Sequence, residues 1–203
     1  MNSNLTISHS TNGGKQKVYM SINKIDIKDF LECVDVSRVK GLCKNGCINY
    51  MQKWSCPPFS PRITDIITKN NYCNAIIICG YIHMHEMQYI KNTYQQVKAA
   101  NMILKSICER KARMIESNVA GYALLSGSCN LCKPCAKKRG LPCQKPLSMR
   151  YSLEATGVDV QLLTQKYCNH ELLWYQKGKN LHYTSVVTAV LTNNPTLSVE
   201  DIF

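Results

Sequence analysis

The stretch AIIICGY, residues 75–81, is a continuous apolar run that contains three consecutive isoleucines. A short, unbroken apolar run rich in β-branched residues is typical of a buried strand. A buried strand needs other elements packed against its sheet. The run therefore predicts a buried strand.

The sequence downstream of this strand changes to a helical period. Apolar residues recur at three- and four-residue steps between His85 and Ser117, which predicts a long helix. Val119–Leu125 then predicts a second strand that runs directly into a group of cysteines. A further helix is expected from Gly157 or Val158 to about Tyr167, followed by strands at 172–175 and 182–191.

The sequence upstream is more polar and less regular. Residues 1–17 are polar with no apolar run behind them, so we expect a flexible N-terminal tail. Residues 18–32 predict a short alternating or helical piece, and the two glycines and three prolines of residues 39–62 predict a loop-rich segment. Together these patterns predict an α/β fold: one sandwich over residues 18–203, with a small mixed sheet and two cysteine-rich metal loops at 43–58 and 129–146.

Twelve cysteines in 203 residues need an explanation. The N-terminus lacks the apolar core of a signal peptide, and the longest apolar stretch, residues 73–82, is too short to span a bilayer. We therefore expect a cytoplasmic protein with no membrane partner. In that reducing compartment, clustered cysteines more often hold metal or do redox chemistry than form disulfides.

The strongest signal is GSCNLCKPCAKKRGLPCQKP, residues 127–146. Its cysteines follow the pattern C-x2-C-x2-C-x7-C and are Cys129, Cys132, Cys135 and Cys143. Short C-x2-C-x2-C runs wrap three corners of a 4Fe–4S cluster, and a more distant cysteine supplies the fourth. Zinc is the alternative, although four-cysteine zinc sites usually have two separated C-x2-C pairs.

A second group of cysteines lies upstream, at Cys43, Cys47 and Cys56. A 4Fe–4S cluster held by three cysteines leaves one iron open to substrate, which is the arrangement of a catalytic cluster. Cys33 or Cys168 is the alternative: either residue could be a fourth ligand, and the cluster would then be closed. Sequence spacing leaves both arrangements open.

The remaining cysteines have simpler interpretations. Cys79 in the apolar strand and Cys108 on the helix are expected to be small buried residues. Cys73 is left without an assignment.

The formal net charge of +12 favours an anionic partner. An acidic redox protein and a small anionic substrate both fit this charge. RNA would fit too, but the basic residues are scattered apart from short runs such as KKR at 137–139, and no RNA-binding signature accompanies them.

The combination of CKNGCINYMQKWSCPP, CNLCKPCAKKRGLPCQKP and SMRYSLEATGVDV resembles an uncharacterised bacterial and archaeal family of predicted metal-binding, cysteine-rich proteins. The resemblance covers about residues 40–190 and implies a metal, with iron–sulfur the expected form, but it implies no reaction. Gln144 departs from the pattern, which leads us to expect an arginine there. The matching positions are Trp54, Cys56, Pro57, Pro58, Pro146, Ser152, Glu154, Ala155, Gly157 and Asp159.

Glu154 is the candidate catalytic residue. Ser152 and Glu154 suit the start of a helix, and Asp159 suits a helix cap, so the segment also has a purely structural interpretation. The functional interpretation makes Glu154 a proton donor or an acid beside a cluster.

Three functions follow from these observations. The first is an iron–sulfur protein with two 4Fe–4S clusters, one an electron relay and the other performing reductive or sulfur-transfer chemistry on a small anionic substrate. The second is a non-catalytic, ferredoxin-like electron carrier. The third is a zinc-binding interaction module. Whether the chain is an enzyme stays open at this point.

Overall fold

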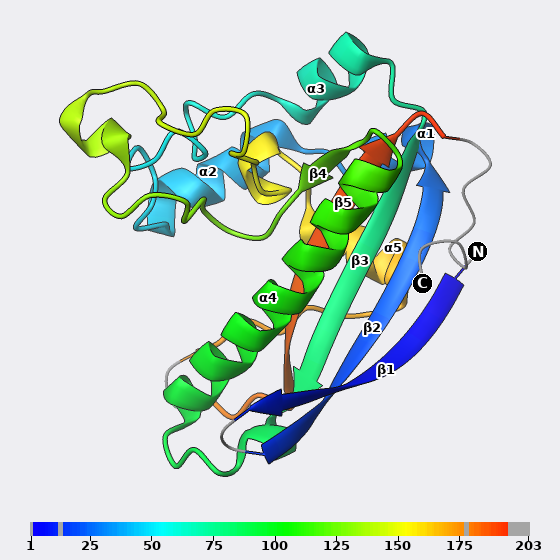
Figure 1. Cartoon of the computed structure of the whole chain (residues 1–203), viewed down its shortest axis with the longest axis vertical. Helices are drawn as coiled ribbons and strands as arrows, with labels where there is room; N and C mark the ends of the chain where they lie inside the picture. Colours follow the sequence, from blue (N-terminus) through cyan, green and yellow to red (C-terminus); the bar gives the residue numbers. More distant parts are fainter. Residues whose placement is uncertain (1, 12–13, 177–178, 195–203) are drawn as a thin grey trace.

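The computed structural model describes residues 2–11, 14–176 and 179–194 (Figure 1). Residues 195–203, at the end of the expected domain, and residues 1, 12 and 13 of the expected tail lie outside the described residues. The elements in chain order are β1 Asn2–Thr11, β2 Gly14–Asp26, α1 Ile27–Leu31, α2 Val36–Gly46, α3 Ile63–Asn70, β3 Asn74–His83, the 3₁₀ helix η1 Met84–Met87, α4 Thr93–Asn118, β4 Tyr122–Leu124, the 3₁₀ helices η2 Ala136–Arg139 and η3 Glu154–Thr156, α5 Val160–Cys168, and β5 Tyr183–Thr192.

The five strands form one sheet in the order β1-β2-β3-β5-β4. The predicted strand at 75–81 is β3, at the centre of this order, and its residues 75–80 are all buried. The α/β class is therefore confirmed. The predicted mixed sheet is wrong: all four strand pairings of the sheet are antiparallel. β3 and β4, which α4 connects, run in the same direction. They do not pair with each other, because β5 lies between them and is antiparallel to both.

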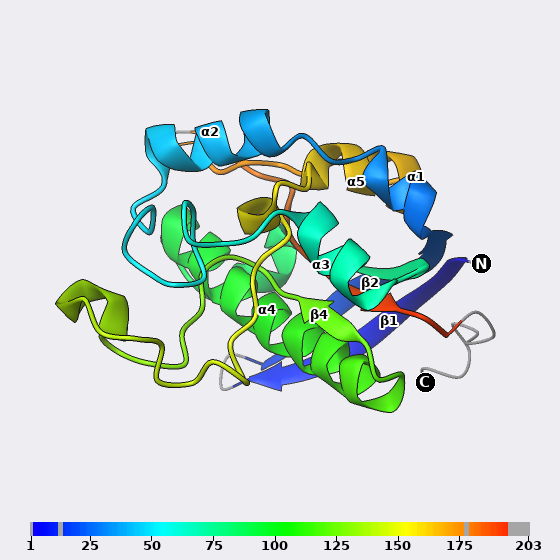
Figure 2. The ribbon, with the colours of Figure 1, turned by 90° about the horizontal axis from the view of Figure 1, so that it is seen from above.

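Helices cover both faces of the sheet. α4 lies across one face, while α1 and α5 lie on the other, and Figure 2 shows this division from above. Successive side chains of β3 point to opposite faces of the sheet. Ile76 and Ile78 pack in the core under α4, whereas Ala75 and Ile77 pack in the core on the opposite face. This is why the run is apolar without interruption.

Gly80 sets how closely α4 approaches β3. A Cβ at residue 80 would lie 2.7 Å from Cys108 Sγ and 3.4 Å from Leu104 Cδ2. Cys108 is fully buried, and burial raises the pKa of its thiol to about 12. The expectation that Cys108 is a small core residue is therefore confirmed.

The N-terminal tail is the main correction to the sequence prediction. Residues 2–11 are strand β1, and residues 14–17 belong to β2, to which β1 pairs in an antiparallel hairpin. Leu5 and Ile7 alternate with exposed polar residues and pack against the core under α4. An edge strand with one half-buried face needs few apolar residues, so its overall polarity resembles that of a loop.

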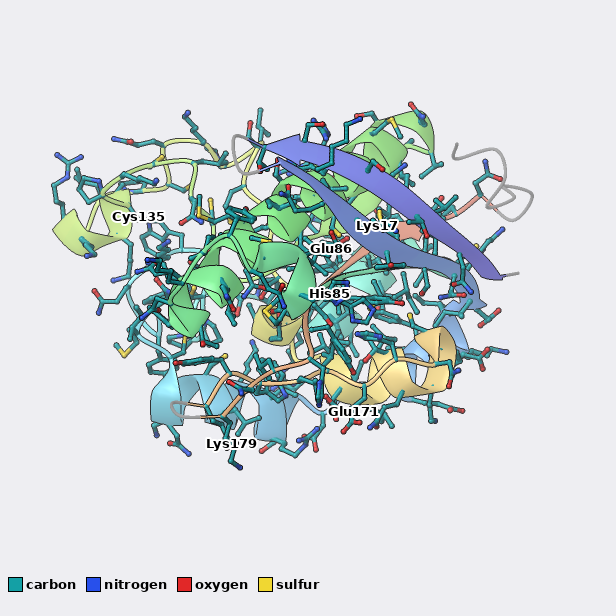
Figure 3. The ribbon with its side chains drawn as sticks, turned by 90° about the horizontal axis from the view of Figure 1, so that it is seen from below. Lys17, His85, Glu86, Cys135, Glu171 and Lys179 are labelled. Carbon is teal, nitrogen blue, oxygen red and sulfur yellow. The ribbon has the colours of Figure 1, made fainter. Side chains whose placement is uncertain are left out.

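Other boundaries differ at particular residues. Residues 39–46 of the predicted loop-rich segment belong to α2, and residues 172–175 have no regular structure. α4 begins at Thr93 rather than near His85, because the Asn92 side chain caps it by accepting a hydrogen bond from the Gln95 amide at 3.0 Å. The preceding η1 is held to β2 by the Lys17 amide, which donates to Glu86 at 3.2 Å (Figure 3).

Within the described residues, no helix combines the length and apolarity needed to cross a membrane.

The close approach at Gly80 gives a stability test. Gly80→Ala should destabilise the protein by about 1–3 kcal/mol, because the new methyl group overpacks the contact with Cys108. In the double variant Gly80→Ala/Cys108→Ala the sulfur is gone, so the penalty for the added methyl group should shrink. Denaturant unfolding of the four proteins in this cycle measures the coupling. Equal penalties with and without the sulfur would contradict the assignment.

Candidate metal centre

The first cysteine loop, residues 43–58, begins inside a helix. Cys43 lies in α2, and Cys47 follows its end, with the Cys47 amide donating to the Cys43 carbonyl at 3.1 Å. Residues four apart on a helix lie on the same face, so the two thiols are neighbours. The chain then folds back through the Met51 amide, which donates to the Pro57 carbonyl at 3.0 Å. This turn returns Cys56 to the same side.

The three cysteines of the first loop line one cavity of about 750 Å³, which we call the first cavity. Its other wall comes from the segment around η3, including Glu154, Ala155 and Val158. Gly157 allows this wall to pack on α2: its φ is +98°, and a Cβ there would lie 2.8 Å from Val36 Cα. The Asp35 amide donates to the Gly157 carbonyl at 3.0 Å and fixes the contact.

Glu154 and Asp159 are the acidic residues among those described that line the first cavity with these thiols. Glu154 is half-buried, and it lines both the first cavity and a second cavity of about 370 Å³. Burial raises the pKa of its carboxyl group, and hydrogen bonds from its own backbone amide and from Ser152 oppose the rise. The Glu154 charge also raises the pKa of Cys43, which shows that the two groups interact.

Burial favours the protonated form of two of these thiols, Cys43 and Cys56. Burial is the largest cause that raises the pKa of Cys43, and the neighbouring Cys47 adds to it. Burial likewise raises the pKa of Cys56, opposed by the Ser55 hydroxyl. Metal ligation would therefore have to displace protons from both residues.

The two candidates for a fourth ligand lie elsewhere. Cys33 is buried in the core on the α1 and α5 side, where burial raises its pKa to about 11. Cys168 ends α5, and its sulfur accepts a hydrogen bond from the Asn23 side chain at 3.4 Å. Of the described residues, neither of these cysteines lines the first cavity.

The second cysteine loop, residues 129–146, is irregular apart from the short η2. Cys129, Cys132, Cys135 and Cys143 are all half-buried, and all four line one small cavity. Trp54 and Ser55 of the first loop line it as well. Cys135 lies in the part of the chain that projects to one side of the sandwich (Figure 3).

A four-residue segment of the first loop, residues 53–56, holds the second loop in place. The Lys53 ammonium donates to three acceptors at the start of that loop: Ser128 Oγ at 2.9 Å, the Cys129 carbonyl at 2.8 Å and Asn130 Oδ1 at 2.9 Å. The Cys129 amide donates back to Ser55 Oγ at 3.0 Å. Sequence analysis missed Lys53 and Ser55, although both lie within the KWSC motif that ends in Cys56.

Aromatic contacts reinforce this junction. Trp54 Nε1 donates to the Leu141 carbonyl at 2.9 Å, and its ring packs edge-on against Phe59 with centroids 5.1 Å apart. The Lys137 ammonium lies 4.5 Å from the Phe59 ring centroid and 5.4 Å from that of Trp54. The two cysteine loops are therefore one connected structure.

The donor set suits a soft or borderline metal, since both cavities are bordered by thiols. None of the twelve cysteines is in a disulfide. In residues 2–11, 14–176 and 179–194, however, no three His, Cys, Asp or Glu side chains converge tightly enough to hold a metal ion as they stand. The cysteines of each loop are suitable metal ligands and line one cavity. To bind a metal together, their side chains would have to move closer to one another.

A family model described as predicted metal-binding protein (DUF2284) matches residues 29–191. The match spans most of the chain, so the protein belongs to this family. Neither the curated proteins nor the solved structures include a match to the chain. Metal binding is the property that the family description carries, and it agrees with the resemblance seen in the sequence.

The hydrogen bonds between residues 53–56 and the second loop can be tested by mutation. Lys53→Met should raise amide hydrogen exchange at residues 128–131 by about tenfold or more, because charge-assisted hydrogen bonds to that segment are lost. Lys44→Met is the matched control, since Lys44 is an exposed lysine of α2. Unchanged exchange in the Lys53 variant would show that these bonds do not hold the second loop.

Proposed function

We propose that this member of the predicted metal-binding family carries two 4Fe–4S clusters and works on a small substrate in the first cavity. Cys129, Cys132, Cys135 and Cys143 would hold the relay cluster. Cys43, Cys47 and Cys56 would hold the second cluster, with one iron lacking a cysteine. The observation that carries the proposal is that these three thiols line the same large cavity as a partly buried carboxyl group.

The spacing of the second loop supports iron–sulfur over zinc. Three cysteines at C-x2-C-x2-C intervals suit the corners of a cubane, whereas a tetrahedral zinc site more often uses two separated pairs. The clustering of seven cysteines in two loops suits metal ligation in a reducing, cytoplasmic setting.

The junction between the loops supports electron transfer from one site to the other. The Ser55 hydroxyl, next to Cys56 in the chain, accepts a hydrogen bond from the Cys129 amide at 3.0 Å, so the two proposed cluster sites are joined directly. Such clusters supply one-electron redox chemistry, and an iron without a protein ligand adds a Lewis-acid position. The basic run at Lys137, Lys138 and Arg139 lies in η2, within the second loop, and suits an acidic redox partner.

The residues around the first cavity would bind and orient the substrate. Its lining is mainly apolar, with Leu42, Tyr50 and Trp174 among its walls. Arg38 also lines it and pairs with Asp159, so a small anionic substrate would compete with that carboxylate for the guanidinium group. Glu154 borders this cavity and the next, and in this proposal it would pass a proton to a bound substrate.

Metal analysis tests the cofactor. Protein purified without oxygen should be brown and contain roughly eight iron and eight sulfide per chain. Cys56→Ser and Cys132→Ser should each lose about half of the iron, since each removes a ligand from a different site. Cys73→Ser is the control, because Cys73 lies outside both loops. Colourless protein with zinc, or with no metal, would overturn the proposal.

An external ligand tests the open iron. Cyanide should change the electron paramagnetic resonance signal of the reduced protein at one cluster, and this change should be lost in Cys56→Ser but kept in Cys132→Ser. Cys33→Ser and Cys168→Ser should keep the full iron content and the cyanide effect. Iron loss in either of these two variants would instead identify a fourth ligand, and a catalytic role for the site would fall.

A further inference from the structure

A pair of cysteines lies apart from both metal loops. Cys79 is in β3, on the face of the sheet that α5 covers, and Cys168 is the last residue of α5. Cys79 is paired across the sheet with Ser21 of β2, and both cysteines border one cavity. Asn23 of β2 donates to Cys168 Sγ at 3.4 Å and to Ser21 Oγ at 3.1 Å, so one amide group contacts both Cys168 and the strand partner of Cys79. Three different elements therefore converge on one pair of thiols.

This pair borders its own cavity of about 290 Å³. The lining includes both cysteines, Ser21, Tyr81 and His170. The His170 ring stacks on Tyr81 with centroids 4.8 Å apart, and His170 Nε2 lies 2.7 Å from Ser185 Oγ, so this wall is fixed. The cavity can take one arm of a disulfide such as oxidised glutathione and is too small for a folded partner.

The two sulfurs have unequal exposure. Cys79 is 1% exposed, whereas Cys168 is half-buried and borders the cavity. Cys168 is therefore the more accessible of the two sulfurs to a reagent that enters the cavity.

The two sulfurs also differ in their hold on a proton. The hydrogen bond from Cys79 is the largest influence on Cys168 and lowers its pKa, and those from Ser21 and Asn23 act in the same direction. The same bond and burial raise the pKa of Cys79 well above its usual value. These donors outweigh burial, which disfavours a thiolate at residue 168. The negative end of the α5 dipole also acts against the thiolate.

We propose that Cys168 and Cys79 form a thiol–disulfide exchange site for small polar disulfides, with Cys168 as the attacking sulfur and Cys79 as the resolving sulfur. The site is separate from the proposed clusters and does not depend on them. It also gives Cys168 a role other than that of the fourth metal ligand considered from the sequence.

The exchange runs in two balanced steps. The Cys168 thiolate attacks one sulfur of a disulfide RSSR, which breaks the S–S bond, forms the mixed disulfide Cys168–S–S–R and releases RS⁻. The Cys79 thiol then gives up its proton and attacks the Cys168 sulfur, which releases the second RS⁻ and closes a Cys79–Cys168 disulfide. Two protein thiols are oxidised, and RSSR is reduced to two thiols.

Oxidised glutathione is the probe for this site. Anaerobically purified protein is treated with it, alkylated, and mapped by mass spectrometry of unreduced peptides. We expect a Cys79–Cys168 disulfide and two equivalents of released glutathione per chain. We also expect Cys168 to be alkylated by iodoacetamide at least about tenfold faster than the exposed Cys73 at neutral pH.

Two variants distinguish exchange from a merely buried pair. Cys79→Ser should stop at a glutathione adduct on Cys168, and Cys168→Ser should leave Cys79 unmodified. Cys73→Ser should behave like the unmodified protein. Folded protein that forms no Cys79–Cys168 disulfide, or that reacts as fast at Cys73 as at Cys168, would overturn the proposal. Both variants should retain their iron, so failure here is distinct from failure of the cluster proposal.

Discussion

Burial of β3 on both faces is the constraint on which the structure depends. Its isoleucines pack alternately under α4 and under the layer that contains α1 and α5, so no polar side chain fits along residues 75–79 without loss of one core. Both layers are occupied by the elements that stabilise the sheet. The cysteine loops therefore lie beyond the sheet, at the ends of α2 and β4, where they are free of the demands of core packing.

Much of this architecture could be predicted from the sequence, where each local signal agreed with the tertiary contacts. The strand at 75–81 and the α5 helix, capped by Asp159, are examples. The N-terminal strand was wrongly predicted as a tail because the alternation of Leu5 and Ile7 is short and surrounded by polar residues. The place of β5 between β3 and β4 depends on pairing between segments far apart in sequence, which no local pattern encodes.

The candidate site shows the same division. Spacing alone grouped the cysteines of each loop, because residues a few positions apart stay close in any fold. Cys33 lies in the core and Cys168 at the end of α5, and neither borders the first cavity, so a role for either as fourth ligand stays a prediction. Glu154 was identified as a candidate from its motif, whereas its position facing the first loop depends on Gly157 and the packing against α2.

Residues 53–56 contribute to both loops. Cys56 lines the first cavity, and the Lys53 ammonium donates to the carbonyl of Cys129, which lines the cavity of the second loop. A displacement of either loop is therefore transmitted to the other through four consecutive residues, because the same short segment borders one cavity and is hydrogen-bonded to the lining of the other.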